Sequence, residues 1–122
     1  VQLASRLSTA DAIGLDAELE ERIKDADVLI NATSVGMHPH DNETLVHAEL
    51  MHPDLVVFDI VYNPMETRLL KEAKRAGVKR IVHGVKLLVY QGAASFQIWT
   101  NEEPPIAVME KAVIDALRRF KT

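Results

Sequence analysis

The sequence predicts an α/β protein in which helices flank a doubly wound parallel sheet in three layers. Two observations support this fold class. Residues 27–33 and residues 55–62 are continuous apolar runs bounded by polar residues, which is the pattern of parallel strands covered on both faces. Stretches with helical spacing alternate with these runs along the chain. Such alternation is typical of right-handed strand, helix, strand units and therefore of a parallel sheet.

The composition fits one domain of an ordinary globular protein. The chain has 122 residues, of which 48% are hydrophobic and 26% are charged. Its net charge of −4 offers no cationic surface to nucleic-acid phosphates, and no apolar run is long enough to span a membrane. The absence of cysteine excludes disulfides and thiolate catalysis. Because the acidic first segment resembles no targeting peptide, we expect a cytoplasmic protein without nucleic-acid or membrane partners.

The first quarter of the chain predicts three elements before the first long apolar run. Leu3 and Leu7 lie four residues apart, so residues 1–8 are expected to be the tail of a helix. Residues 11–15 are expected to form a short strand. Residues 16–24 are expected to form a polar helix with a single apolar stripe, made of Leu19 and Ile23.

The helix that follows the run 55–62 has clear boundary signals. Asn63 is expected to be its N-cap, with Pro64 in the first helical position and Glu66 closing a capping box. Gly77 is expected to end it. The side chains expected to face the core are Leu69, Leu70 and Ala73.

The last third of the chain predicts one short strand and two helices. Residues 79–84 form a weaker apolar run, and residues 86–99 have the pattern of a helix. The pair Pro104 and Pro105 is expected to open the final helix. Its apolar residues recur at helical spacing and are Ile106, Met109, Val113, Leu117 and Phe120.

Candidate binding residues lie where the strands end, since ligands of open α/β sheets sit outside the carboxyl ends of the strands. The segment Asn31 to Met37 follows the first run and offers small side chains, a glycine, and amide and hydroxyl groups. A plain polar turn explains this segment equally well. Asp59 is a carboxyl group within an apolar strand, and we expect a structural role in which it accepts backbone hydrogen bonds. Tyr62, at the strand exit, is better placed to offer its hydroxyl to a ligand.

Gln91 is a polar residue within an apolar helical stripe. Leu87, Gln91, Ala94 and Ile98 fall on one face of the helix predicted at 86–99. A half-buried amide there must be satisfied by the backbone, which is the common outcome, or by a polar ligand.

Other site types have weaker support. His38, His40, His47 and His52 cluster near the loop 38–49, but their spacing fits no established zinc pattern, so we expect solvated histidines and no metal. The five glycines are too dispersed to form a dinucleotide-binding turn or a phosphate-cradling loop.

Three ordered motifs resemble the C-terminal half of the quinate/shikimate dehydrogenase family. They are Asn-Ala-Thr-Ser-Val-Gly-Met at 31–37, the segment 59–77 that begins Asp-Ile-Val-Tyr-Asn-Pro-Met-Glu-Thr, and the segment 84–100 that begins Gly-Val-Lys-Leu-Leu-Val-Tyr-Gln-Gly. The resemblance runs from about Asp27 to the C-terminus. It implies that residues 1–122 are the C-terminal part of a Rossmann-like NADP-binding domain. The substrate-binding domain, which supplies the catalytic lysine and aspartate, and the glycine-rich phosphate loop have no counterpart here.

The resemblance also implies a reaction and roles for individual residues. Members of the family reduce 3-dehydroshikimate to shikimate with NADPH in aromatic amino acid biosynthesis, and some use quinate or NAD. The residues implied to contact the cofactor are Ala32, Thr33 and Ser34 near the nicotinamide ribose, Ile60 against the nicotinamide, and Gly84 through its backbone. The residues implied to contact the substrate are Tyr62 and Gln91.

One motif departs from the family, and two other functions remain open. Where the family usually has Asp-Gly-Leu-Gly-Met, this chain has His83-Gly84-Val85-Lys86-Leu87. The chain alone is expected to be inactive. The alternatives are a non-catalytic module that forms a homo-oligomer, favoured by a sheet edge left exposed, and a module that binds a dinucleotide without turnover.

Overall fold

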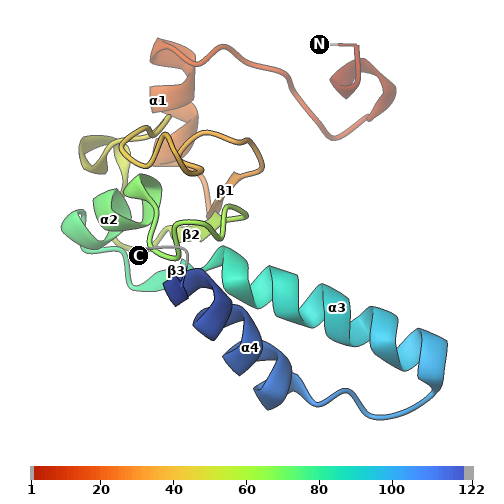
Figure 1. The fold of residues 1–122 in the computed structure, drawn as a ribbon. Coiled ribbons are helices and arrows are strands. Elements are labelled where there is room, and N and C mark those ends of the chain that lie inside the picture. The colour runs from red at the N-terminus through yellow and green to blue at the C-terminus, as the bar shows by residue number, and fades with distance from the viewer. Residues whose placement is uncertain (1, 120–122) are drawn as a thin grey trace.

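The computed structural model describes residues 2–119, and its centre is a three-stranded parallel sheet (Figure 1). The strands are β1 (Val28–Asn31), β2 (Val56–Asp59) and β3 (Arg80–Val82), and they lie in the order β1-β2-β3. Both pairings are parallel, with Asn31 opposite Asp59 and Val57 opposite Ile81. All three strands therefore end at the same edge of the sheet, and the predicted parallel α/β fold is confirmed.

Helices precede, connect and follow these strands. The α-helices are α1 (Ala17–Lys24), α2 (Arg68–Arg75), α3 (Gly84–Thr100) and α4 (Ile106–Arg119), and the 3-10 helices are η1 (Ala4–Arg6) and η2 (Ala48–Leu50). None of the helices within residues 2–119 is long and apolar enough to cross a lipid bilayer. The helices predicted at 16–24, at 86–99 and from Pro104 onwards are thus confirmed, with α3 longer than predicted at both ends.

The main core lies between one face of the sheet and helices α1 and α2. Leu29, Val57 and Ile81 lie side by side across the three strands and face this core. From the helices it receives Ile23 of α1 and the predicted residues of α2, which are Leu69, Leu70 and Ala73. Burial of these side chains is the main stabilising contribution, about 1.5–3 kcal/mol for each large one.

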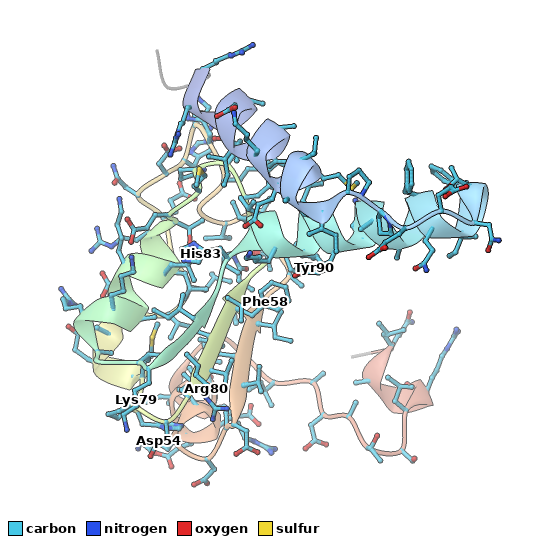
Figure 2. The ribbon with its side chains drawn as sticks, turned by 90° about the horizontal axis from the view of Figure 1, so that it is seen from below. Asp54, Phe58, Lys79, Arg80, His83 and Tyr90 are labelled. Atoms are coloured by element: carbon cyan, nitrogen blue, oxygen red, sulfur yellow. The ribbon has the colours of Figure 1, made fainter. Side chains whose placement is uncertain are left out.

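The opposite face of the sheet is open within residues 2–119. Ile30, Phe58 and Val82 lie next to one another across this face, and Figure 2 labels the middle residue, Phe58. Ile30 is 53% exposed, and Val28 of the same strand is 50% exposed. The prediction that residues 27–33 are covered on both faces is therefore wrong for the described chain, because within residues 2–119 the face of β1 that carries Val28 and Ile30 stays half-exposed to solvent.

Helix α2 begins later than its sequence signals predict. Its N-cap is Thr67, whose hydroxyl accepts the Leu70 N–H at 3.4 Å, so Asn63 is not the cap. Residues 63–66 instead form bends. The predicted end is confirmed, since α2 stops at Arg75 and Gly77 follows with a φ of 78°, a conformation that glycine adopts without strain.

The chain before α1 differs from the prediction. Residues 11–15 form no strand, and they lie on the surface, with Leu15 69% exposed. A lone segment without a neighbouring strand cannot complete a ladder of backbone hydrogen bonds. The helix tail predicted at 1–8 is reduced to the single 3-10 turn η1, while Val1 lies outside the described residues.

Helices α3 and α4 form a hairpin that extends away from the sheet (Figures 1 and 2). Val85, Val89 and Leu117 are buried between the two helices, and partly buried Ile106, Met109 and Val113 pack against them. Four of the five residues predicted for the final apolar stripe therefore face α3, and the fifth, Phe120, lies outside the described residues. Asn101 ends α3 in the left-handed conformation, with a φ of 57°.

Candidate functional site

The candidate site lies at the edge where the three strands end. β1 ends at Asn31, β2 at Asp59 and β3 at Val82. Figure 2 shows His83, which follows β3, at this end of the sheet, while Asp54 and Lys79 lie at the opposite end. The segments that follow β1, β2 and β3 enclose two neighbouring pockets.

The first pocket lies between the turn after β1 and the exit from β2. We call it the turn pocket, and its volume is about 390 Å³. Its lining residues are Thr33, Ser34, Met37, His38, Ile60, Val61, Tyr62 and Asn63. The backbone N–H of His38 donates to the Asn63 carbonyl oxygen at 2.9 Å and closes the far side of this pocket.

The second pocket lies between the exit from β2 and the first turns of α3. We call it the helix pocket, and its volume is about 120 Å³. Its lining residues are Ile60, Tyr62, Gly84, Leu87, Leu88 and Gln91. Ile60 and Tyr62 line both pockets, so the two are adjacent, and we treat them together as one candidate site.

Six of the seven residues singled out by the sequence line these two pockets. Thr33 and Ser34 line the turn pocket, Gly84 and Gln91 line the helix pocket, and Ile60 and Tyr62 line both. Ala32 lines neither. Residues that lie 58 positions apart in the sequence, such as Thr33 and Gln91, thus border one site because the parallel strands end together.

Gly84 permits a close approach between α3 and β2. A Cβ atom at Gly84 would lie 2.5 Å from the carbonyl oxygens of Ile60 and Val61, a distance that real Cβ atoms do not adopt. The missing side chain therefore sets the width of the helix pocket and leaves the backbone of α3 accessible next to Ile60.

Polar groups beneath the pockets form a connected network. The carboxyl group of Asp59, which is fully buried, accepts hydrogen bonds from Asn31 Nδ2 and from the Val61 N–H, both at 3.0 Å. It also accepts the Thr67 hydroxyl at 2.5 Å. The predicted structural role of Asp59, acceptance of backbone hydrogen bonds, is confirmed by the bond from Val61.

Several polar groups of the turn after β1 form hydrogen bonds with one another. Thr33 donates both its hydroxyl, at 2.6 Å, and its backbone N–H, at 3.2 Å, to Asn31 Oδ1. The Thr33 hydroxyl in turn accepts the Val35 N–H at 3.1 Å. Since its proton is already donated, the Thr33 hydroxyl can meet a ligand only as an acceptor.

Tyr62 and Gln91 are both accessible from solvent. Tyr62 is 43% exposed at the junction of the two pockets. Gln91 is exposed, not half-buried as expected, and its Nε2 donates to the Leu88 carbonyl oxygen at 2.9 Å. The backbone therefore satisfies part of the Gln91 amide, which was the more common of the two expected outcomes.

Two of the residues that depart from the family motif, His83 and Lys86, make their contacts away from the helix pocket. Lys86 Nζ donates to Glu110 Oε1 of α4 at 2.6 Å, and this hydrogen bond raises the pKa of Lys86 above its ordinary value. His83 Nδ1 lies 3.2 Å from the Met65 carbonyl oxygen. Only Leu87 of the changed residues lines the helix pocket.

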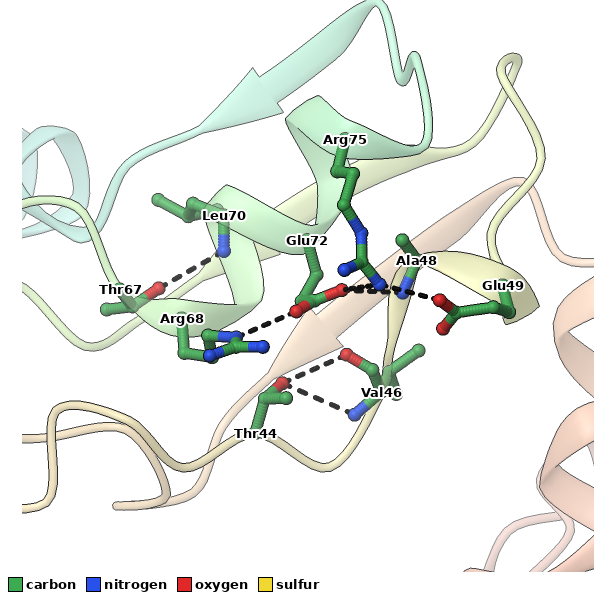
Figure 3. A network of polar contacts seen from close by, with 9 residues as sticks. All are labelled: Thr44, Val46, Ala48, Glu49, Thr67, Arg68, Leu70, Glu72 and Arg75. Carbon is green, nitrogen blue, oxygen red and sulfur yellow. Dashed lines mark hydrogen bonds and ion pairs between the residues drawn. The ribbon is translucent and has the colours of Figure 1, made fainter.

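A buried carboxylate holds the long loop that leads away from the turn pocket (Figure 3). Glu72 of α2 accepts the Ala48 N–H at 3.0 Å and forms ion pairs with Arg68 at 2.7 Å and Arg75 at 2.9 Å. The Ala48 hydrogen bond and the two arginines hold the pKa of Glu72 below its ordinary value, although burial opposes them. Glu72 thereby fixes the end of the loop without lining either pocket.

The loop histidines make separate contacts. His38 Nδ1 pairs with Asp41 at 3.1 Å, and His40 Nδ1 lies 3.3 Å from Glu43. His52 Nε2 lies 2.9 Å from the Ala26 carbonyl oxygen. Across residues 2–119, no three histidine or acidic side chains come together as a metal site would require.

Several residues that line the two pockets are not predicted as site residues by the sequence. His38 and Asn63 line the turn pocket, and Leu88 lines the helix pocket. The position of Asn63 directly after Tyr62 was interpreted only as a helix cap. Leu88 follows Leu87 on the helix, and nothing in its apolar character separates a pocket residue from a core residue.

Comparison with known proteins gives one consistent result. The family model of the shikimate 5'-dehydrogenase C-terminal domain matches residues 84–114. A shikimate dehydrogenase (NADP(+)) of Methanosarcina mazei is 52% identical over 124 aligned positions, which cover 97% of this chain and 44% of that protein. The chain thus spans less than half the length of the curated relatives it matches.

Solved structures agree in fold. A shikimate dehydrogenase crystallised with NADP+ is 47% identical, with a TM-score of 0.74 over 78% of this chain and 33% of that one. The shikimate 5-dehydrogenase of Thermus thermophilus, in complex with NADP(H) and shikimate, is 36% identical, with a TM-score of 0.73 over 80% of this chain and 36% of that one.

Proposed function

We propose that this chain, which belongs to the shikimate dehydrogenase family, forms one wall of the nicotinamide pocket in an NADP-dependent oxidoreductase that interconverts shikimate and 3-dehydroshikimate. Residues 84–114 match the family model of the shikimate 5'-dehydrogenase C-terminal domain, which supports assigning residues 1–122 to the C-terminal part of the cofactor-binding domain. The observation that carries the proposal is that six of the residues implied by the family motifs line two adjacent pockets, which share Ile60 and Tyr62. A cytoplasmic location is part of the same proposal.

The walls of the site suit a flat cofactor ring and its ribose. Ser34 and Thr33 offer small polar groups on one side, Ile60 offers an apolar surface, and Gly84 leaves backbone accessible on the other side. NADP would supply the hydride acceptor or donor. In this proposal Thr33 and Ser34 bind near the nicotinamide ribose, while Ile60 and Gly84 contact the nicotinamide. Ala32, which lines neither pocket, keeps its proposed place near the ribose only as the residue before Thr33.

Tyr62 and Gln91 are proposed to bind the substrate. Both border the helix pocket, and their polar groups suit the hydroxyl and carboxylate groups of shikimate. They orient the substrate next to the nicotinamide, so their contribution is positional. This chain supplies no proton-transfer group for the reaction in the proposal, and the isolated chain is proposed to be inactive.

The test uses the full-length protein that contains this chain. Tyr62→Phe and Gln91→Leu should each raise the KM for shikimate by about tenfold with a smaller change in kcat, because they remove contacts made in both ground and transition states. Tyr90→Phe is the matched control, since Tyr90 adjoins Gln91, is 54% exposed and lines neither pocket. An unchanged KM in both Tyr62→Phe and Gln91→Leu would overturn the substrate assignment.

A second candidate function concerns the isolated chain. Its open sheet favours the formation of a homo-oligomer. Within residues 2–119, β1 pairs on one side only, and Val28 and Ile30 present a half-exposed apolar surface beside that edge. Size-exclusion chromatography of the 122-residue chain and of Ile30→Lys tests this. An oligomer that Ile30→Lys converts to a monomer supports association through this surface, and a monomeric parent chain rejects it.

A further inference from the structure

The two walls of the turn pocket come from different strands, and regular pairing ends before they begin. Asn31 and Asp59 are the last residues paired between β1 and β2. The Ile60 N–H still donates to the Asn31 carbonyl oxygen at 3.1 Å. Beyond that point the segments 33–37 and 60–62 diverge to form the pocket. The backbone bond from His38 to Asn63 joins them again on the far side, and side chains hold them on the near side.

Asp59 lies at the point of divergence and contacts the supports of both walls. Its Oδ1 accepts Asn31 Nδ2 from the first wall and the Val61 N–H from the second, each at 3.0 Å. Its Oδ2 accepts the Thr67 hydroxyl, which also caps α2. Because Asp59 is 0% exposed, its carboxyl oxygens cannot hydrogen-bond to bulk water, and these three donors satisfy them instead.

Asn31 connects Asp59 to the first wall of the turn pocket, the turn 33–37. Its Nδ2 donates both to Asp59 and to the Val35 carbonyl oxygen, the latter at 3.1 Å. Its Oδ1 accepts the N–H and hydroxyl of Thr33. The Asn31 side chain is thus held from below by Asp59 and itself holds the turn at two positions, Thr33 and Val35.

We infer that Asp59 is a positioning residue for the nicotinamide pocket. It lines neither pocket, and on the side of the pocket nearest the strands it holds the turn 33–37 and the segment 60–62 in place, where the cofactor ring is proposed to lie. The inference rests on the proposed function. Small displacements of a bound ring change both affinity and the rate of hydride transfer, so loss of Asp59 alters catalysis without removing a ligand contact.

The experiment compares Asp59→Ala and Asp59→Asn with Glu72→Gln in the full-length protein. Glu72 is the matched control because it is a buried carboxylate, 2% exposed, that ties a loop to α2 and lines neither pocket. The measurements are the Kd for NADPH, KM and kcat for shikimate oxidation, and the thermal midpoint Tm.

Asp59→Ala should weaken NADPH binding and lower kcat, each by about tenfold, since displacements near 1 Å can have effects of up to about a hundredfold. Asp59→Asn should recover part of both losses, because its remaining oxygen can accept Asn31 and Val61. Glu72→Gln should lower Tm with Kd and kcat near those of the parent. Equal catalytic losses in Glu72→Gln, or unchanged Kd and kcat in a folded Asp59→Ala, would overturn the inference.

A second measurement keeps the inference testable if Asp59→Ala does not fold or if the parent binds no NADPH. Backbone hydrogen exchange at Thr33 and Val35 should be faster in Asp59→Asn than in the parent, because a neutral amide oxygen accepts the Asn31 amide more weakly than a carboxylate does, and it should be unchanged in Glu72→Gln. A parent without NADPH affinity would reject the proposed function alone. Exchange that is unaltered at both positions in Asp59→Asn would reject the positioning role alone.

Discussion

Gly84 packs so closely against Val61 that a Cβ atom at position 84 would lie 2.5 Å from the Val61 carbonyl oxygen. Gly84 is the first residue of α3, and Val61 lies in the exit from β2. The contact therefore joins the hairpin of α3 and α4 to the sheet at the helix pocket. Neither partner can yield easily, because the clashing atoms belong to the backbone.

The first prediction is that Gly84→Ala displaces α3 and damages the helix pocket. The extra methyl group should lower the free energy of unfolding by about 1–3 kcal/mol, as overpacking usually does. It should also weaken NADPH binding, because the backbone of α3 moves away from Ile60. Chemical denaturation and a fluorescence titration with NADPH measure the two effects. Gly92→Ala is the control, since a Cβ there would meet only the end of the Met109 side chain at 3.4 Å.

The second prediction concerns acid stability and Glu72. Its folded-state pKa lies below the ordinary value of 4.5, so its contribution to stability is present above pH 4.5 and is lost as the pH falls through the folded pKa. Glu72→Gln should therefore lower stability at neutral pH and flatten its decline below pH 4.5. Urea unfolding at a series of pH values provides the data.

The control for Glu72 is Asp115→Asn. The pKa of Asp115 is also lowered, through its hydrogen bond with Lys111, but this pair lies on the surface of α4. Solvent screening leaves such pairs with little effect. Stability curves that run parallel in the parent and in Glu72→Gln would contradict the role given to Glu72.

A third prediction concerns the end of α3. Asn101 has a φ of 57°, and a residue with an ordinary side chain loses about 1 kcal/mol or more in this left-handed conformation. Asn101→Ala should therefore lower the Tm, whereas Asn101→Gly should keep or raise it. Thermal unfolding measures the Tm of both variants. A higher Tm for Asn101→Ala than for Asn101→Gly would contradict the prediction.

The fourth prediction is that the ion pair between Lys86 and Glu110 contributes little to stability or to substrate binding. Both side chains are partly exposed, Lys86 by 50% and Glu110 by 30%, and solvent screening leaves such pairs with little effect on stability. Lys86→Met should change the Tm only slightly and leave the KM for shikimate unaltered, because Lys86 lies on the side of α3 away from the helix pocket. A large rise in KM would show that this departure from the family motif affects the site.

The sequence predicted the parts of the fold that depend on local pattern. Apolar runs located all three strands, and helical spacing located α3 and α4, because their periodicity reflects which side is buried. The start of α2 was misplaced since Asn63 and Thr67 are both acceptable caps. In the folded chain the cap is Thr67, whose hydroxyl also donates to the buried Asp59. The strand expected at 11–15 does not form, because a strand needs a neighbouring strand to complete its backbone hydrogen bonds, and a local pattern does not show whether one is present.

The candidate site could be predicted in its members and not in its geometry. Strand ends and family motifs pointed to Tyr62 and Gln91, and both border the helix pocket. The central position of Asp59 depends on the register that sets Asn31 opposite Asp59. That register is a tertiary property, so no local pattern could reveal it.

The most direct test of the proposed function is the formation of NADPH when the full-length protein that contains this chain is mixed with shikimate and NADP+. The account predicts steady NADPH production that depends on shikimate, that is impaired in Gly84→Ala and that persists in Tyr90→Phe. A correctly folded full-length protein that binds NADP+ and yet produces no NADPH from shikimate would contradict it.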